Sequence, residues 1–188
     1  MACRRCPLWA TRTRAVPGTG PADARIMLVG EAPGRQEDLR GEPFVGAAGR
    51  VLDALLRSVG LTRGEVFITN VVKSRPFEGP PPGRNRAPRG PEIAACRIWL
   101  DEQLRIVDPA VVVPMGRIAV ERFLPGVSIS AVHGRPQESG GRIILPLYHP
   151  AAALRGRRMR EVIERDFRVL RRFVAGSGRV GSNPPRTA

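Results

Sequence analysis

Apolar runs alternate with amphipathic stretches along most of this chain. Runs of strand type span residues 26–29, 65–69, 110–114 and 142–147. Stretches with helical periodicity span residues 47–58, 91–107, 116–124 and 161–174. Short apolar runs are typical of buried strands, whereas apolar positions three and four residues apart are typical of helices. Strands that alternate with helices predict an α/β fold with a parallel sheet covered on both faces.

The sharpest change of pattern lies between residues 26 and 60. The apolar run ends in Gly-Glu-Ala-Pro-Gly at 30–34, a polar loop follows, and a helical pattern begins at about Ala47. This order places backbone N–H groups at the carboxyl edge of a sheet, where open α/β folds bind ligands. Such turns are also common in α/β domains without a site. A second long loop is predicted at 73–90, which is rich in Pro, Gly and Arg.

Two polar residues directly follow predicted strands. Asn70 ends the second strand, and its amide offers a donor and an acceptor to a planar ligand. The alternative for Asn70 is a cap of the strand end. His149 follows the fourth strand and precedes Pro150, which predicts a rigidly held imidazole at the sheet edge. Its alternative is a capping His-Pro turn.

The charge of the chain points to a polyanionic partner. The formal net charge is +14, and Lys73 is the only lysine among the 31 basic residues. Arginine suits bidentate contacts with phosphate, so the surplus favours nucleic acid. A GC-rich genome explains the ratio of arginine to lysine but not the surplus of positive charge.

The length of 188 residues fits one domain, predicted at 1–174. The tail at 175–188 consists mainly of Gly, Ser, Pro and Arg and is predicted to be disordered. No run approaches the roughly 18 apolar residues of a membrane span, and the first residues lack a signal-peptide pattern. A cytoplasmic protein without a membrane partner is therefore expected.

The three cysteines are too few for a disulfide scaffold in a chain of this size. Cys3 and Cys6 form a C-x-x-C pair that precedes every predicted core element. Redox pairs of this kind normally follow a strand, so metal ligation is favoured. A complete site needs about two further ligands, and Cys96 is the only other cysteine.

Five motifs together are more specific than any of them alone. In chain order they are GEAPGRQED, GEPFVGAAG, ITNVVKSRP, NRAP and YHPAAALR. This ordered set, spread over about residues 3–172, resembles the family 4 uracil-DNA glycosylases, the iron–sulfur branch of their superfamily. The resemblance implies a three-layer α/β/α sandwich around a short four-stranded parallel sheet. A uracil flipped out of DNA would lie across the carboxyl ends of these strands.

The resemblance also implies which residues bind the base. Phe44 would stack on uracil, and Asn70 would read its amide edge. The loop that contains Ala32 and Gly34 would supply backbone donors to a carbonyl of the base. Glu37 would lie near C5 of uracil, where the methyl group of thymine would clash. The alternatives are a core aromatic for Phe44 and a solvated loop residue for Glu37.

By the same resemblance, His149 would donate a hydrogen bond to uracil O2 as the glycosidic bond breaks. The better-known branch of the superfamily has a water-positioning aspartate where this chain has Ala32. Glu31 and Glu37 are therefore the candidates for orienting water. Pro150 and its neighbours would follow the DNA backbone, with Leu154 or Arg155 filling the gap left by the flipped base.

The chain departs from the family at its metal site. The family binds a 4Fe–4S cluster through four cysteines; Cys3, Cys6 and Cys96 match three of them, and Ser74 stands at the fourth position. Serine is a harder and weaker ligand of iron than thiolate. Three outcomes are open: a cluster with an oxygen or exogenous fourth ligand, a three-iron form, or no cluster.

The predicted function is removal of uracil from DNA by a monofunctional glycosylase, which leaves an abasic site. One alternative is a uracil-DNA binding protein that is non-catalytic or traps the base covalently. The loop at 77–83 has no histidine, which disfavours trapping. The other alternative is a Rossmann-like enzyme acting on free nucleotides. A monomer is expected, with a sliding clamp as a candidate partner.

Overall fold

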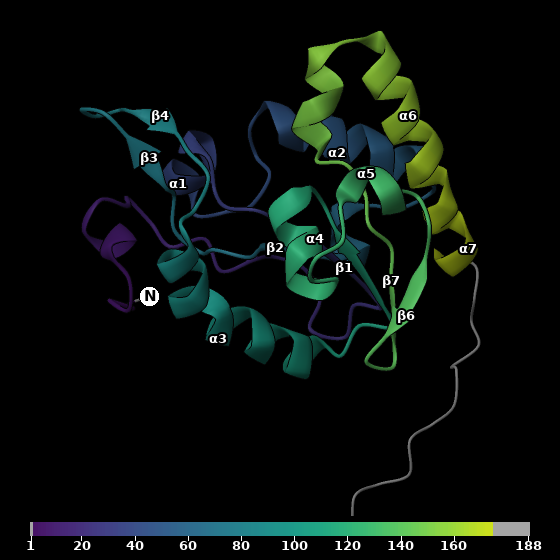
Figure 1. The fold of residues 1–188 in the computed structure, drawn as a ribbon, viewed down its shortest axis with the longest axis horizontal. Helices are drawn as coiled ribbons and strands as arrows, with labels where there is room; N and C mark the ends of the chain where they lie inside the picture. Colours follow the sequence, from purple (N-terminus) through teal and green to yellow (C-terminus); the bar gives the residue numbers. More distant parts are fainter. Residues whose placement is uncertain (1, 175–188) are drawn as a thin grey trace, which may run out of the picture.

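A five-stranded sheet forms the centre of the computed structural model, which describes residues 2–174 (Figure 1). The predicted disordered tail lies outside the described residues. The strands, in their order across the sheet, are β2 (Phe67–Asn70), β1 (Ile26–Gly30), β5 (Val111–Pro114), β7 (Arg142–Ile144) and β6 (Gln137–Ser139).

The first four of these strands are parallel, as predicted. The prediction of four strands in total was wrong, because β6 pairs antiparallel with β7 at the edge of the sheet. Its residues Gln-Glu-Ser are polar and largely exposed, so they carry no apolar strand signal. The predicted run 142–147 is a strand only as far as Ile144, although a single bridge still pairs Leu147 with Met115.

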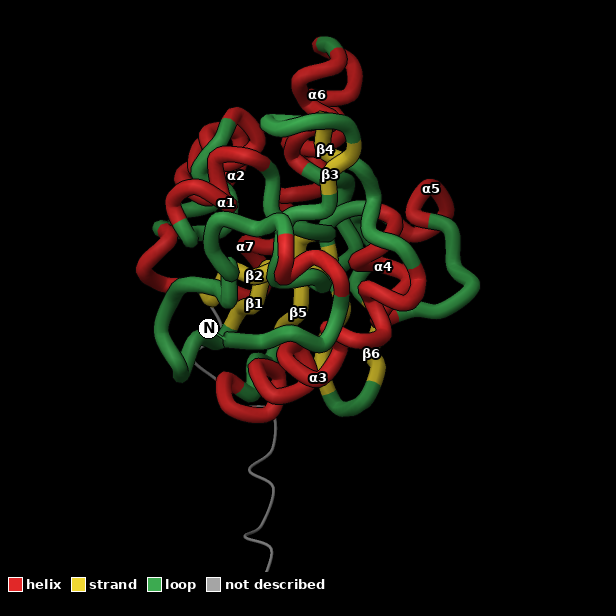
Figure 2. Tube along the Cα trace, turned by 90° about the vertical axis from the view of Figure 1, so that its left-hand side faces the viewer, coloured by secondary structure: helices red, strands yellow, loops and turns green. Residues whose placement is uncertain are grey.

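Helices cover both faces of the sheet. On one face lie α2 (Ala47–Ser58) and α6 (Arg157–Phe167); on the other lie α3 (Gly90–Val107) and α4 (Arg117–Phe123), as Figures 1 and 2 show. Side chains of β1 alternate between two apolar cores: Ile26 and Leu28 pack on the α2 side, Met27 and Val29 on the α3 side. A strand buried on both faces needs apolar residues at every position, which explains the continuous run.

Several short elements were not predicted. The segment after the Gly-Pro-Gly turn contains α1 (Arg35–Arg40) rather than a loop throughout. The hairpin β3 (Phe77–Glu78) and β4 (Arg84–Asn85) lies inside the predicted loop 73–90. The closing helix begins earlier than predicted and is broken after α6. The remaining short helices are α5 (Ile129–Val132), α7 (Arg171–Val174) and the 3-10 turns Pro7–Ala10, Arg63–Glu65, Pro150–Arg155 and Arg168–Leu170.

None of the helices between residues 2 and 174 has the length and apolar character needed to cross a bilayer.

Candidate active site

Three of the residues predicted to bind or cleave the substrate meet at the carboxyl edge of the sheet. Gly30 and Asn70 end neighbouring strands and face each other in the register of β1 and β2. A Cβ atom on Gly30 would lie 2.4 Å from Oδ1 of Asn70 and 2.6 Å from Cζ of Phe44. The ring of Phe44 in turn stacks on that of His149, with centroids 5.4 Å apart and planes inclined by 27°. Because glycine has no Cβ atom, the side chains of Phe44 and Asn70 can both lie against the backbone at position 30.

The backbone around Phe44 is held in an unusual conformation. Phe44 has a positive φ of 54°, which few residues other than glycine adopt, and its side chain is buried. The Arg63 guanidinium donates to the carbonyl oxygens of Phe44 at 3.1 Å and Pro43 at 2.6 Å, and it pairs with Asp53. Sequence reasoning missed Arg63, because it lies outside the motifs and only the fold brings it to this loop.

Gly49 allows α2 to pass directly beneath this loop. A Cβ atom at position 49 would lie 1.7 Å from the carbonyl oxygen of Phe44. We expect Gly49→Ala to lower the free energy of unfolding by about 3 kcal/mol, because the overlap is with backbone and no rotamer relieves it. Urea unfolding measures this change. The control is Gly90→Ala, where an added Cβ meets no atom within 4 Å; an equal loss in both variants would contradict the assignment.

His149 begins the 3-10 turn Pro150–Arg155, and its ring faces the site with a defined tautomer. Nδ1 accepts a hydrogen bond from the backbone N–H of Ala151 at 3.2 Å. A neutral ring that accepts at Nδ1 carries its proton on Nε2, which makes Nε2 a donor. Burial lowers the pKa of His149 to about 4, although the nearby charge of Glu37 opposes this effect. The imidazole is therefore neutral at pH 7.

Gly116 supports His149 from the end of β5. It has a positive φ of 91°, and a Cβ atom there would lie 3.2 Å from Cβ of His149. Its N–H donates to the carbonyl oxygen of Leu147, two residues before the histidine. Sequence reasoning missed Gly116, although a glycine two residues after a buried strand was the available signal.

Glu37 organises the loops around the site. Its Oε1 accepts from the N–H groups of Val45 at 2.9 Å and Gly46 at 2.8 Å, and its Oε2 accepts from that of Gly34 at 3.1 Å. These bonds join the first turn of α1 to the start of α2. Both oxygens are therefore engaged by backbone donors.

Glu31 differs from Glu37 in having no hydrogen bond or salt bridge to its carboxylate from residues 2–174. Burial raises its pKa, and the positive charge of Arg117 works against this shift. Ala32 and Gly34, which follow it, are half-buried at the mouth of the loop. A Cβ atom on Gly34 would lie 3.1 Å from Nδ2 of Asn85, so the NRAP motif reaches the same loop.

Lys73 holds the carboxyl end of β2. Its Nζ donates to Oγ1 of Thr69 and to the carbonyl oxygen of Asn70, both at 2.6 Å, and to Oε1 of Gln103 at 2.7 Å. The side chain is almost completely buried, and desolvation lowers its pKa to about 7. Lys73 thus supports the backbone of Asn70 and does not reach the surface.

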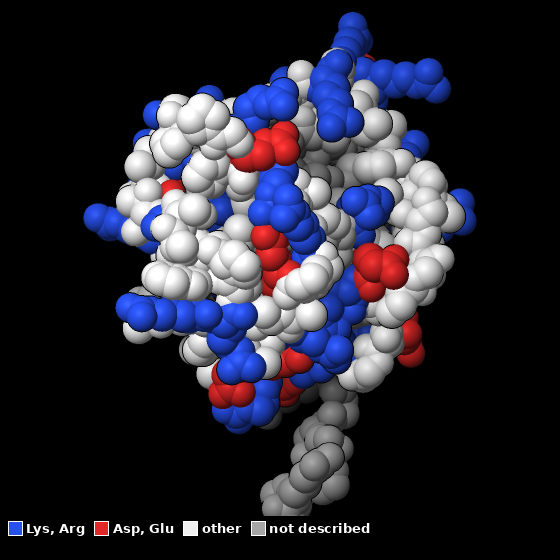
Figure 3. Space-filling model, turned by 60° about the vertical axis from the view of Figure 1, so that its left-hand side comes forward, with Lys and Arg blue, Asp and Glu red and all other residues white. Residues whose placement is uncertain are grey.

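The turn after His149 presents the residues predicted to contact DNA. Pro150 is buried, whereas Leu154 is 53% exposed and Arg155 is also exposed. Further exposed arginines follow at Arg157, Arg158 and Arg160. Figure 3 shows Lys and Arg side chains over one face of the molecule, with a group of them projecting at its top. Arg157 pairs with Glu161, so part of this charge is compensated.

The other histidine is used within the fold. Nδ1 of His133 is hydrogen-bonded to the buried carboxylate of Asp166, and its ring packs on Tyr148. We therefore assign His133 a structural role in the fold.

The three cysteines and Ser74 line one small cavity together with Trp99. Cys3 and Cys6 come from the N-terminal segment, Cys96 from α3, and Ser74 from the segment after β2. The fold therefore brings together all four positions that the motifs singled out. In the part of the chain that the structure describes, no three His, Cys, Asp or Glu residues form a site for a single metal ion.

Two polar contacts surround this cavity. The Arg12 guanidinium donates to Oγ of Ser74 and to the carbonyl oxygen of Cys3, both at 3.0 Å. The backbone N–H of Lys73 donates to Sγ of Cys96 at 3.2 Å. The indole N–H of Trp99 is buried and faces the thiol of Cys3, where it helps to lower the pKa of that group. Donors directed at sulfur suit a group with sulfur ligands, such as an iron–sulfur cluster.

Comparison with known proteins indicates the family of the chain. The family model of the uracil DNA glycosylase superfamily matches residues 17–171. The chain is 42% identical to the type-4 uracil-DNA glycosylase of Sulfurisphaera tokodaii, over 93% of this chain and 81% of that protein. It is 44% identical to the type-4 uracil-DNA glycosylase of Archaeoglobus fulgidus, over 90% of this chain and 87% of that protein.

A solved structure extends the likeness to the fold. The crystal structure of wild-type SMUG2 from Pedobacter heparinus superposes with a TM-score of 0.57, at 14% identity, over 82% of this chain and 77% of that one. With its motifs in order, its fold and its sequence identity to these relatives, the chain belongs to the type-4 uracil-DNA glycosylases.

Proposed function

We propose that this uracil-DNA glycosylase binds the flipped base against Phe44 and Asn70 and cleaves its bond to the sugar with a hydrogen bond from neutral His149. The observation that carries the proposal is the convergence of Gly30, Phe44, Asn70 and His149 at one edge of the sheet. The glycosidic bond is inaccessible inside a duplex, so the base must first leave the stack.

The proposed chemistry is hydrolysis of the N1–C1′ bond. The bonding electrons stay on uracil, and positive charge develops on the sugar. The Nε2–H of His149 donates to O2 of the departing anion, where negative charge accumulates. Water adds to C1′ and releases a proton, and uracil leaves an abasic site behind. The hydrogen bond from Ala151 to Nδ1 supports this role, because it fixes the proton on Nε2.

We assign the orientation of water to Glu31 and the arrangement of the loop to Glu37. Both oxygens of Glu37 already accept backbone hydrogen bonds, which leaves less capacity for a water molecule. The carboxylate of Glu31 has no such partner among residues 2–174, and its raised pKa makes it a better proton acceptor. Glu37 would still border C5 of the base and disfavour the methyl group of thymine.

The pH dependence of excision tests the neutral histidine. A donor with a pKa of about 4 stays neutral above pH 5.5. The single-turnover rate should therefore be nearly flat between about pH 5.5 and 8. It should fall as the pH approaches 4, because a protonated Nδ1 can no longer accept from Ala151 and the ring loses the contact that orients Nε2–H. A rate that rises as the pH falls through 7 would instead require the imidazolium. The Glu31→Gln variant is measured in the same way, because any change of the rate with pH that is caused by the titration of Glu31 would be absent from its pH profile.

We also propose that the cysteine cavity holds a 4Fe–4S cluster through Cys3, Cys6 and Cys96. When bound, the cluster would tie the N-terminal segment to α3, and no step of base excision needs it. Ser74 offers only a hydroxyl oxygen at the fourth position, and Arg12 already donates to it. The iron next to Ser74 should therefore be the most weakly held.

Ser74→Cys tests this assignment. Anaerobically reconstituted wild-type protein should lose one of its four iron ions on mild oxidation and give the electron paramagnetic resonance signal of a three-iron cluster. The Ser74→Cys variant should keep all four, because thiolate binds iron more strongly. The control is Ser58→Cys, which adds an exposed thiol on α2. Identical iron loss in the wild type and Ser74→Cys, or no cluster in either, would contradict the proposal.

Covalent trapping of the base is disfavoured. The 77–83 loop contains no histidine, and His133 is bonded to Asp166. A nucleophilic lysine is also unsupported, because Lys73 is buried and bonded to three acceptors. Uracil-containing DNA is the substrate that the family implies, and a sliding clamp remains a proposed protein partner.

A further inference from the structure

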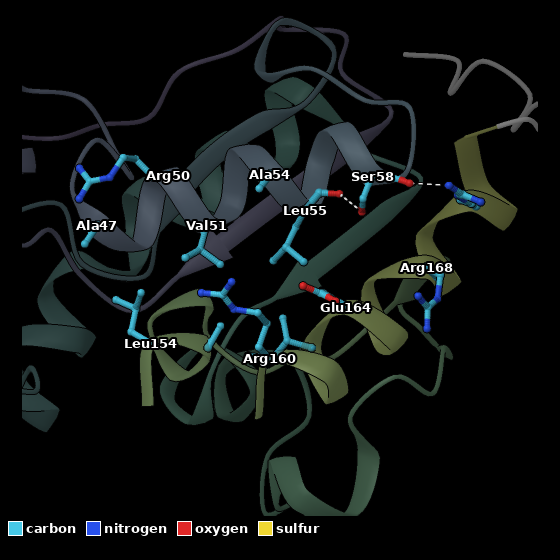
Figure 4. Close-up of a pocket in the computed structure, with 13 residues that line it drawn as sticks. Ala47, Arg50, Val51, Ala54, Leu55, Ser58, Leu154, Arg160, Glu164 and Arg168 are labelled. Carbon is cyan, nitrogen blue, oxygen red and sulfur yellow. Dashed lines mark hydrogen bonds between the residues drawn. The ribbon is translucent and has the colours of Figure 1, made fainter. Parts of the chain in front are cut away.

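We propose that the groove between α2 and α6 binds an acidic peptide segment with apolar side chains, contributed by a partner protein. The groove has a volume of about 460 Å³. Figure 4 shows α2 on one side of it and α6 with the preceding turn on the other. It is separate from the residues assigned to the base and from the cysteine cavity, and it shares Leu154 and Arg160 with the segment predicted to contact DNA.

The floor of the groove is apolar. Val51, Ala54 and Leu55 line it from α2, and Leu154 and Ile163 line it from the other side. In Figure 4, the side chains of Val51 and Leu55 point from α2 across the groove. Ala54 and Leu154 are exposed to solvent. Apolar surface of this kind gains free energy when apolar side chains of a ligand cover it.

The rim is positively charged. Four arginines and a single carboxylate line it: Arg50, Arg160, Arg168, Arg171 and Glu164. Among residues 2–174, Arg50, Arg160 and Arg168 form no salt bridge, and Arg171 donates to the carbonyl oxygen of Ser58. In Figure 4, Arg50 lies at one end of the groove, Arg160 near its middle and Arg168 toward the other end. Positive side chains spaced along an apolar floor complement an acidic amphipathic segment.

The course of the groove favours a peptide over DNA. It begins beside Ala47 and Leu154, near the strand ends where the base would bind, and runs along α2 to Ser58. Because α2 leads the chain back from the carboxyl edge of the sheet, the groove leads away from the substrate site. A sugar-phosphate backbone has no large apolar face to cover its floor. A peptide bound here would hold a partner protein beside the DNA.

Ala54→Glu is the variant that tests the groove. The residue is exposed, so the new carboxylate leaves the core intact and repels an acidic ligand on the floor. Ala94→Glu is the matched control: it makes the same change at an exposed alanine of α3, on the opposite face of the sheet. Both variants carry the same net charge, and both should excise uracil as the wild type does.

The probe is a fluorescein-labelled peptide of about 16 residues, with leucines at helical spacing among Asp and Glu. Fluorescence anisotropy at about 0.15 M salt limits non-specific attraction to the basic protein. We expect saturable binding to the wild type, weakened about tenfold or more by Ala54→Glu and less than twofold by Ala94→Glu. A uracil-free single-stranded oligonucleotide should bind both variants equally.

Three results would overturn the inference. No saturable binding would show that the groove does not recognise this chemistry. Equal weakening by Ala54→Glu and Ala94→Glu would show attraction to net charge alone. Weakening of oligonucleotide binding by Ala54→Glu, with peptide binding unchanged, would assign the groove to nucleic acid. Each result is independent of whether the protein excises uracil.

Discussion

Replacing His149 with alanine should lower the single-turnover rate of uracil excision by about 10²–10³-fold at neutral pH. The reason is that the Nε2–H is the only side-chain donor we assign to O2 of the departing uracil anion, and its position is fixed by the bond between Nδ1 and Ala151. The loss should appear in the rate of the chemical step more than in the affinity for DNA, because phosphate contacts dominate binding. Rapid-quench assays and binding titrations measure the two separately.

His149→Gln is the informative control for this variant. Its side-chain amide supplies a neutral N–H donor of similar reach, so it should recover part of the activity lost in His149→Ala. The ring of Phe44 loses its stacking partner in both variants. A common loss of packing would therefore lower both rates equally, and that outcome would contradict hydrogen-bond donation as the role of His149.

Removing the amide of Asn70 should have the second-largest effect. We expect Asn70→Ala to lower the efficiency of uracil excision by about 10²-fold, because the polar edge of the bound base would lose its partner. The Asn70→Asp variant should excise uracil no faster than Asn70→Ala, since a carboxylate has no N–H donor and repels the departing anion. Steady-state and single-turnover assays with uracil in a defined oligonucleotide check both variants.

The control for Asn70 concerns the support of β2. Gln103 contacts Nζ of Lys73, which in turn holds the backbone of Asn70. Gln103→Ala should cost far less activity than Asn70→Ala, because it leaves the amide in place. An Asn70→Ala variant that excises uracil at the wild-type rate would show that this side chain does not read the base.

Much of the fold could be predicted because its signals are local. The four parallel strands are short apolar runs, and α2 and α3 have clear helical periodicity. The alternation of these strands and helices along the chain predicted a sheet covered by helices on both faces. The strand β6 and the hairpin of β3 and β4 are short and mostly polar, and each is recognisable only from its pairing with a neighbouring strand. Helix α1 depends on Glu37, whose bonds to distant backbone are not visible in the sequence.

The candidate site shows the same division. Phe44, Asn70 and His149 could be named because they lie in motifs, Asn70 and His149 after predicted strands and Phe44 in the loop before α2, and the structure brings them together. Arg63 and Gly116 act through contacts made only after folding, with the carbonyl oxygen of Phe44 and with Cβ of His149. The cavity shared by the cysteines and Ser74 likewise joins three separate segments, although the motifs already pointed to these positions.

The most direct test of the account is multiple-turnover excision from a uracil-containing oligonucleotide, followed by heat and alkali to reveal abasic sites. We expect each wild-type molecule to release several uracils, to leave an intact strand before alkali, and to form no stable adduct. The His149→Ala variant, shown to be folded, should be strongly impaired in the same assay. A single covalent adduct per protein molecule, or no release by folded protein with its metal site filled, would contradict this expectation.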